Sequence, residues 1–133
     1  MKDKKQRLRR VRKNRSPKAI LFDKVWAKCS KFVVLRDRGV CFTCGEMGNQ
    51  AGHFRHGKTK ETYFNDKQIH CQCVKCNFFL SGNLGIYGFK LTKLLGAKKV
   101  EQIINQSYKF KNWTISELEG LDRYFTKKLK KTA

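Results

Sequence analysis

Two pairs of cysteines place the strongest constraint on how this chain can fold. The two CxxC pairs are separated by 28 residues and are formed by Cys41, Cys44, Cys73 and Cys76. From residue 41 to residue 77 the chain contains only two residues, Ile69 and Val74, from the Val, Ile and Leu set. Aliphatic burial therefore cannot organise this segment alone. Four thiolates in two such pairs predict a closed tetrahedral zinc site, which supplies folding energy on the order of 10 kcal/mol.

The other two cysteines of the six leave alternatives open. Cys71 belongs to a CxCxxC run, so spacing alone allows either Cys71 or Cys73 to act with Cys76, and the repeated CxxC pattern favours Cys73. Cys29 lies among apolar residues at helical spacing, and we expect it to be a small core residue. A redox-active CxxC is the main alternative to zinc. Disulfides are disfavoured because the sequence shows no export signal.

The chain is strongly basic, with 31 lysines and arginines against 10 acidic residues and a formal net charge of +21. Such a charge opposes compaction unless a polyanion neutralises it, which favours a phosphate-rich partner such as DNA. A surface built only for solubility would mix the two signs more evenly. An acidic membrane face is a weaker alternative, because the N-terminal segment shows no basic amphipathic helix with a clean apolar side.

Residues 1–18 form the most basic segment, with ten lysines or arginines and one aspartate. We expect a disordered arm that contacts DNA phosphates, because this segment has almost nothing to bury. The arm residues expected to contact DNA are Arg7, Arg9, Arg10, Arg12, Lys13 and Arg15. Phosphate contacts of this kind would bind DNA without reading its sequence.

Helical periodicity dominates the rest of the chain. Apolar residues recur at helical spacing over about 19–37, over a stretch that ends at Gly96, and again from Val100. A last helix is expected after Trp113, where Thr114 and Glu117 form a capping box. We therefore predict a single α+β, mostly helical domain over 19–133, with a finger over about 40–85 and two to three helices over about 86–131. No apolar run of about 18 residues occurs, so we expect a cytoplasmic protein.

His53 and Asn77 are the residues whose chemistry is most suggestive. A zinc site that joins the two CxxC pairs folds the segment between them back on itself, so we expect His53 and Asn77 to be neighbours. The Asn77 carbonyl oxygen would suit a hard cation, and His53 would take a proton from water. A base opposite a divalent metal is what phosphodiester hydrolysis requires. A histidine in a zinc module is, however, a structural or surface residue at least as often as a catalytic one.

Four ordered motifs resemble a known family. "CFTCG", "AGHF", "IHCQCVKCN" and "SGN" occur in the order and approximate spacing of the phage recombination nucleases called NinG or Rap, and the resemblance extends over "VLRDRGVCFTCG" and "WTISEL". It implies an endonuclease that acts on Holliday junctions and D-loops through a zinc-stabilised HNH, or ββα-metal, finger. By this resemblance His53 would be the general base, Asn77 would bind catalytic Mg²⁺ or Mn²⁺, and zinc would be structural.

The catalytic metal would need more than one protein ligand, because a single amide is a weak anchor for Mg²⁺. Gly52 stands where many HNH fingers carry a metal-binding aspartate directly before the catalytic histidine. We expect His70 to be the additional ligand, and after it Asp66. The alternative for His70 is a packing histidine or one that supports a zinc ligand.

DNA contacts are also expected outside the arm. His56 more plausibly belongs to a DNA-facing loop than to the catalytic set, and the expected contacts in and after the finger are Arg55, Lys58, Lys60, Ser81 and Asn83. Symmetric cleavage of a four-way junction needs two active sites, so we expect a homodimer. Two other functions stay open, namely a non-catalytic zinc protein that binds nucleic acid, and an HNH nicking enzyme without preference for branched DNA.

Overall fold

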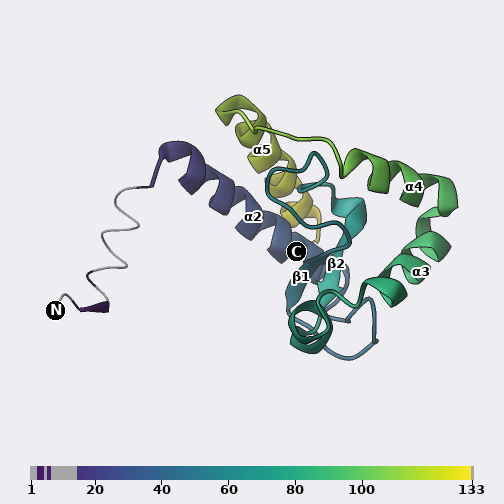
Figure 1. The fold of residues 1–133 in the computed structure, drawn as a ribbon. Coiled ribbons are helices and arrows are strands. Elements are labelled where there is room, and N and C mark those ends of the chain that lie inside the picture. The colour runs from purple at the N-terminus through teal and green to yellow at the C-terminus, as the bar shows by residue number, and fades with distance from the viewer. Residues whose placement is uncertain (1–2, 5, 7–14, 133) are drawn as a thin grey trace.

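The computed structural model describes residues 3, 4, 6 and 15–132, and Figure 1 shows the arrangement. The arm residues Arg7, Arg9, Arg10, Arg12 and Lys13 lie outside this described part. The helices are α2 (Pro17–Arg36), α3 (Leu84–Leu95), α4 (Ala97–Gln106) and α5 (Ile115–Thr132). Two strands, β1 (Gln50–His53) and β2 (Ile69–Gln72), pair antiparallel, with the short 3-10 turn η1 (Asp66–Gln68) before β2 and the π-helical turn η2 (Lys75–Phe79) after it. The predicted α+β, mostly helical architecture is confirmed, with three helices after the finger.

Helix α2 begins where the sequence provides a cap. The Ser16 hydroxyl accepts a hydrogen bond from the backbone amide of Ala19 (3.1 Å), and Pro17 occupies the first turn, where a missing N–H leaves no bond unmade. The chain leaves the helix after Arg36 and turns at Gly39, whose φ of 67° favours glycine. The helix predicted over about 19–37 is thus confirmed, with its start two residues earlier.

Helices α2 and α5 pack side by side and enclose the main hydrophobic core. Its buried residues are Val25, Cys29, Phe32, Val33, Tyr63, Phe64, Ile69, Leu118 and Phe125. The core position expected for Cys29 is confirmed, and burial raises the pKa of its thiol to about 12. The predicted capping box of α5 is also present, because Thr114 Oγ1 accepts from the Glu117 amide (3.1 Å) and Glu117 Oε1 accepts from the Thr114 amide (3.3 Å).

The register of the small sheet decides which side chains share a face. Gln50 pairs with Gln72, Ala51 with Cys71, Gly52 with His70, and His53 with Ile69. Because side chains alternate along a strand, the face that carries His53, Ala51, Cys71 and Ile69 is separate from the face that carries Gln50, Gly52, His70 and Gln72. The first face packs on the α2 core, which includes Ile69 and Ala51.

Helices α3 and α4 pack against each other and lie on the other side of the sheet from α2 (Figure 1). A second, smaller core lies there and consists of Phe54, Tyr87, Leu91 and Val100. The buried Tyr87 hydroxyl lies 2.8 Å from the Gly52 carbonyl oxygen and 3.0 Å from that of Gln68, so it ties α3 to β1 and to η1. None of the described helices combines the length and apolar character that crossing a membrane would require.

Candidate metal centre and active site

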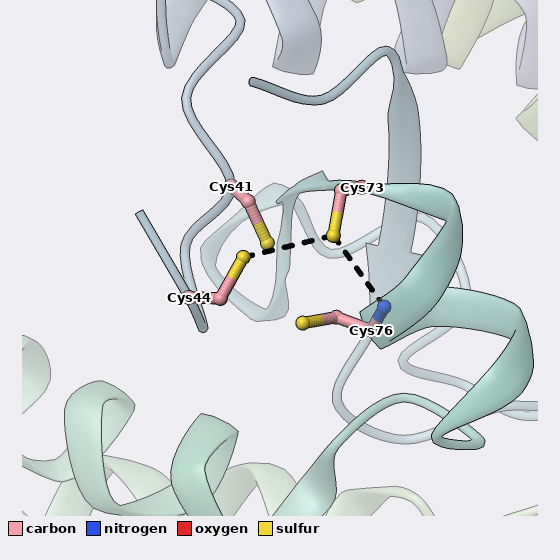
Figure 2. A group of neighbouring side chains, drawn as sticks. All are labelled: Cys41, Cys44, Cys73 and Cys76. Carbon is pink, nitrogen blue, oxygen red and sulfur yellow. Dashed lines mark hydrogen bonds between the residues drawn. The ribbon is translucent and has the colours of Figure 1, made fainter. Parts of the chain in front are cut away.

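The two CxxC pairs meet beside the end of the sheet where Gln50 pairs with Gln72. Figure 2 shows the four cysteine side chains pointing toward one another, two from the turn before β1 and two from the start of η2. Their sulfurs all lie within 4.8 Å of one another. A tetrahedral zinc ion with Zn–S bonds of about 2.3 Å holds its sulfurs roughly 3.8 Å apart, and the Sγ atoms of Cys44 and Cys73 are 3.6 Å apart. The four cysteines can therefore hold a zinc ion.

The local electrostatics also suit a cation. Although burial opposes ionisation, hydrogen bonds from the Thr43 hydroxyl and from backbone amides lower the pKa of Cys41 to about 6, so this thiol is ionised at neutral pH. The pKa of Cys44 moves the other way, to about 12: a backbone hydrogen bond at Glu46 lowers it, but desolvation and the other three sulfurs together raise it more. Four adjacent sulfurs cannot all carry charge unless a cation lies among them.

The structure resolves the ambiguity between Cys71 and Cys73 in favour of Cys73. Cys71 is fully buried on the face of β2 that packs toward α2, and its amide donates to the Asp37 carboxylate (2.8 Å). Cys73 follows the end of β2, where the chain turns into η2 and directs its sulfur to the cluster. The end of β2 at Gln72 explains the difference, because Cys73 lies beyond the strand and no longer shares the face of Cys71.

His53 is the last residue of β1 and is almost completely buried, with 6% of its surface exposed. Its ring packs against those of Trp26 and Tyr63, at centroid distances of 4.7 Å and 4.6 Å. Nε2 lies 2.8 Å from the Tyr63 carbonyl oxygen, which can only accept, so Nε2 carries the proton and Nδ1 keeps a lone pair. Burial lowers the pKa of His53 to about 4, so the ring is neutral at physiological pH.

Asn77 lies beside Gly52, the residue before His53, on the other face of the strand, and direct proximity of His53 and Asn77 stays a prediction. Its Oδ1 lies 3.1 Å from the point where a Cβ would stand on Gly52, and its Nδ2 donates to Gln50 Oε1 (3.0 Å). The amide oxygen of Asn77 is thereby turned toward Gly52. His53 and Asn77 thus flank one strand end from its two faces.

Gln72 fills the space that an aspartate at position 52 would need. A Cβ on Gly52 would lie only 1.8 Å from Gln72 Oε1, so any larger residue at position 52 would clash with the Gln72 side chain. The Gln72 side chain is fully buried, and its Nε2 donates to the Gly82 carbonyl (2.9 Å) and the Thr43 hydroxyl (3.1 Å). These two bonds turn Oε1 toward Gly52, where it has no hydrogen-bond partner. The oxygens of Gln72 and Asn77 therefore converge on one point.

His70 and Asp66 both have hydrogen-bond partners other than Asn77, and their metal-binding role stays a prediction. The ring nitrogens of His70 are already engaged, Nδ1 with Arg36 (3.1 Å) and Nε2 with the Lys67 carbonyl (3.1 Å), and the ring stacks on Phe42. The Asp66 carboxylate accepts from the hydroxyl of Tyr124 (2.7 Å) in α5, which packs with α2 on the far side of the sheet. The contacts of His70 fit the packing role that was its alternative.

His70 belongs to a buried polar network at the end of α2. Asp37 Oδ2 lies 3.5 Å from His70 Nδ1, and Arg36 donates to Asp37 and to the carbonyls of Asp66 and Ile69. Although burial opposes it, hydrogen bonds from Arg36 and the Cys71 amide hold the pKa of Asp37 well below its usual value. This network anchors β2 to α2.

Gln68 is a second glutamine whose importance the sequence did not reveal. Its buried amide accepts from the Arg55 amide (2.6 Å) and donates to the carbonyls of Arg55 (3.2 Å) and Thr62 (2.8 Å). It therefore holds both ends of the loop that follows His53. The sequence position of Gln68, one residue before β2, does not indicate this role, because Arg55 and Thr62 lie outside the paired strands. Gln72 was detectable only once the register was known.

The predicted DNA contacts fall into separate places. Arg15 pairs with Asp23 near the start of α2, and Lys58 Nζ lies 5.7 Å from the Phe22 ring centroid. Arg55, His56 and Lys60 line one pocket of about 180 Å³ together with Tyr108. Ser81 and Asn83 both have positive φ, 51° and 49°, in the turn that precedes α3, and Asn83 Nδ2 lies 3.7 Å from Cys76 Sγ.

The chain matches one family model over residues 1–133, and that family is described as "Bacteriophage Lambda NinG protein". Similar curated proteins are "Protein ninG" of Escherichia phage lambda and "Protein ninG" of Salmonella phage P22, 35% and 34% identical over 104 residues. These alignments cover 74% of this chain and 50% and 51% of the two relatives, so the chain spans about half the length of the curated relatives it matches. No solved structure gives a significant match. The chain belongs to the bacteriophage lambda NinG protein family.

Proposed function

We propose that this chain is a metal-dependent endonuclease that cleaves branched DNA, such as Holliday junctions and D-loops, with an HNH-like, ββα-metal finger. The order β1, β2, η2 and α3, with a zinc-compatible cluster at one sheet end, supports this finger. One observation carries the proposal. His53, with a free Nδ1, directly follows Gly52, where the amide oxygens of Gln72 and Asn77 converge. A base and oxygen ligands at consecutive positions are what metal-assisted phosphodiester hydrolysis needs.

His53 is arranged to act as the general base. The Tyr63 carbonyl fixes the tautomer, so Nδ1 is the atom that would take a proton from the attacking water. Trp26 and Tyr63 hold the ring in place, and its low pKa keeps it unprotonated before DNA binds. An anionic phosphate beside the ring would then raise the pKa of His53 toward the range that favours proton abstraction.

The residues around Gly52 fit a hard divalent cation. Gln72 Oε1 and Asn77 Oδ1 are the oxygens that would hold Mg²⁺ or Mn²⁺, and leaving Oε1 buried without a partner costs free energy in the absence of such a group. When bound, the cation would stabilise negative charge on the phosphate and on the leaving oxygen. Because both protein ligands are neutral, we expect this cation to bind weakly until DNA phosphate adds its own oxygens.

Comparing a branched with an unbranched substrate tests the proposal. A labelled four-way junction and a linear duplex of the same arm sequence are incubated with the protein in Mg²⁺ or Mn²⁺, and again in EDTA. We expect the protein to cut the junction only when Mg²⁺ or Mn²⁺ is present, and to cut the duplex much more slowly. Binding without cleavage would leave a non-catalytic zinc protein that binds nucleic acid. Equal cleavage of both substrates would leave an HNH nicking enzyme without branch preference.

A histidine pair separates catalysis from binding. His53→Ala should slow junction cleavage by about 10²- to 10⁴-fold, because it removes the base, while junction affinity in EDTA changes little. His56→Ala is the matched control, since His56 is exposed and its ring centroid lies 6.0 Å from that of His53. It should retain cleavage within a few fold. Equal losses in the two variants would contradict the assignment of His53 as the base.

The metal ligands can be tested without measuring cleavage. Gln72→Glu places a negative charge on the group that faces Gly52, so Mn²⁺ binding to DNA-free protein, followed by electron paramagnetic resonance, should become tighter. Asn77→Asp should have the same direction of effect. A control substitution at the engaged histidine, His70→Gln, should leave Mn²⁺ binding unchanged. No gain in either acidic variant would exclude Gln72 and Asn77 as the ligands.

A further inference from the structure

We propose that the pocket lined by Arg55, His56, Lys60, Ser107 and Tyr108 binds one unpaired base at the branch point of the DNA substrate. The choice of DNA as the ligand rests on the proposed function. The pocket itself is defined by an exposed aromatic ring, a fixed guanidinium group and a surplus of positive charge, and each of these features has an independent observation behind it.

The aromatic platform is Tyr108, which lies in the segment between α4 and α5 and is 69% exposed. The Arg55 guanidinium carbon lies 5.2 Å from the centroid of the Tyr108 ring. Arg55 is itself held, because its Nε donates to Ser107 Oγ (2.8 Å), and the Ser107 hydroxyl donates to the Ile104 carbonyl (2.6 Å). An exposed ring beside a fixed cation is the arrangement on which proteins stack single-stranded bases.

Backbone hydrogen bonds fix this platform relative to the candidate active site. The Glu61 amide donates to the Lys109 carbonyl (3.1 Å), and the Lys111 amide donates to the Thr59 carbonyl (2.8 Å). The segment that carries Tyr108 is thus joined to the loop that follows His53, and Gln68 holds that same loop at Arg55. A base stacked on Tyr108 would therefore occupy a fixed place with respect to His53.

Charge and size both favour a nucleotide within a DNA strand. Residues 55–62 and 107–113 contain a single acidic residue, Glu61, and the basic residues Arg55, Lys58, Lys60, Lys109 and Lys111. The pocket volume of about 180 Å³ is below the roughly 300–1,000 Å³ of sites that enclose a whole small ligand. One base with its phosphates in the basic surroundings fits better. Bases inside a duplex are stacked on each other, so this pocket would favour DNA whose bases are free at a branch.

The test uses the full chain in EDTA, so that binding is measured without cleavage. The probe is a branched DNA with one unpaired 2-aminopurine at the branch point, and its fluorescence reports stacking. Tyr108→Ala should weaken binding of this probe by roughly 5- to 100-fold and remove the fluorescence change, because each base stacked on an aromatic ring contributes measurably to affinity. Tyr108→Phe keeps the ring and should behave as the unaltered protein does.

Phe89 provides the matched control. It is 62% exposed and Lys93 Nζ lies 4.5 Å from its ring centroid, so it is a comparable aromatic and cation pair on α3 outside the pocket. Phe89→Ala should change neither affinity nor fluorescence. Equal weakening of the probe and of a fully paired duplex by Tyr108→Ala would overturn the base pocket, as would no weakening at all.

Adding Mg²⁺ or Mn²⁺ to the same samples separates this inference from the proposed function. Stacking that depends on Tyr108, without cleavage, would support the base pocket and contradict the endonuclease. If the protein cleaves the branched DNA, but Tyr108→Ala binds that DNA as tightly as the unaltered protein does, the endonuclease is supported and the base pocket is contradicted.

Discussion

The two faces of the β1–β2 sheet differ in what they bury. The face toward α2 buries the neutral ring of His53 among the aromatic rings of Trp26 and Tyr63. The opposite face buries polar groups, in which the Gln72 amide bonds to Gly82 and Thr43 and turns an unpaired oxygen to Gly52. Consecutive residues of a strand face opposite ways, so a base and a cation site can lie one residue apart and still have different surroundings.

This division has a physical advantage for the proposed chemistry. An apolar surround lowers the pKa of His53 and keeps it neutral, whereas a cation needs oxygen ligands that an apolar surround could not supply. A single mixed environment would compromise one of the two requirements. The sheet places the surroundings of His53 and those of the cation site on its two faces. The cysteine cluster lies at one end of the sheet and stabilises both faces.

Removing a cluster cysteine should have the largest effect, because it breaks the frame common to both faces. Cys76→Ser removes one of four sulfurs, so we expect loss of bound zinc and unfolding of the finger over about 40–85, at a cost on the order of 10 kcal/mol of folding free energy. Zinc content by mass spectrometry and amide hydrogen exchange would measure both. Cys71→Ser is the control, since Cys71 is buried outside the cluster, and it should keep its zinc. Zinc loss in Cys71→Ser instead would contradict the four-cysteine site.

The pH dependence of stability tests the apolar face. The pKa of His53 is lowered to about 4 from its ordinary 6.5, so the unfolded chain binds the proton more readily between these values. Stability should therefore fall as the pH drops from about 6.5 to about 4 and then level off, by at most about 3 kcal/mol from this group. Urea unfolding across this range would measure the change.

Substitutions isolate the contribution of His53 to that profile. His53→Gln cannot titrate, so its stability should lack the part of the acid-range loss that belongs to His53. His56→Gln should keep most of the acid-range loss, because burial is the largest cause of the lowered pKa of His53. The same slope in all three proteins would contradict a buried neutral His53.

Much of the frame could be predicted from sequence because it depends on local signals. Helical spacing predicted α2, the Thr114–Glu117 capping box predicted the start of α5, and repeated CxxC spacing predicted the four cysteines that come together. The candidate site was predictable only in part. His53 and Asn77 were placed near one another, yet the faces they occupy depend on strand register.

The contacts of His70 and Asp66 show where local reasoning ends. His70 and Asp66 have the chemistry of metal ligands, but Arg36 and Tyr124, each distant in sequence, already bond to them. Gln72 was overlooked because its importance depends on Gly52, which lies across the sheet and twenty residues earlier. The sequence shows that position 52 lacks an aspartate. Only the structure shows the reason, which is that the Gln72 amide fills the space of that side chain.

Gly52→Ala should have the smallest of these effects and tests the polar face directly. The added methyl would lie 1.8 Å from Gln72 Oε1, so the amide must move and strain its bonds to Gly82 and Thr43, at a cost of about 1–3 kcal/mol. Gly85→Ala is the control, because no atom lies within 4 Å of the added methyl and Gly85 is in α3, so this change should stabilise the protein by roughly 0.5–1 kcal/mol. Combining Gly52→Ala with Gln72→Ala in a double-mutant cycle then assigns the cause. If Gln72 is the obstacle, the cost of Gly52→Ala should shrink once Gln72 is truncated. An unchanged cost would show that position 52 requires glycine for another reason, and the contact between Gly52 and Gln72 would no longer explain why this strand lacks an aspartate.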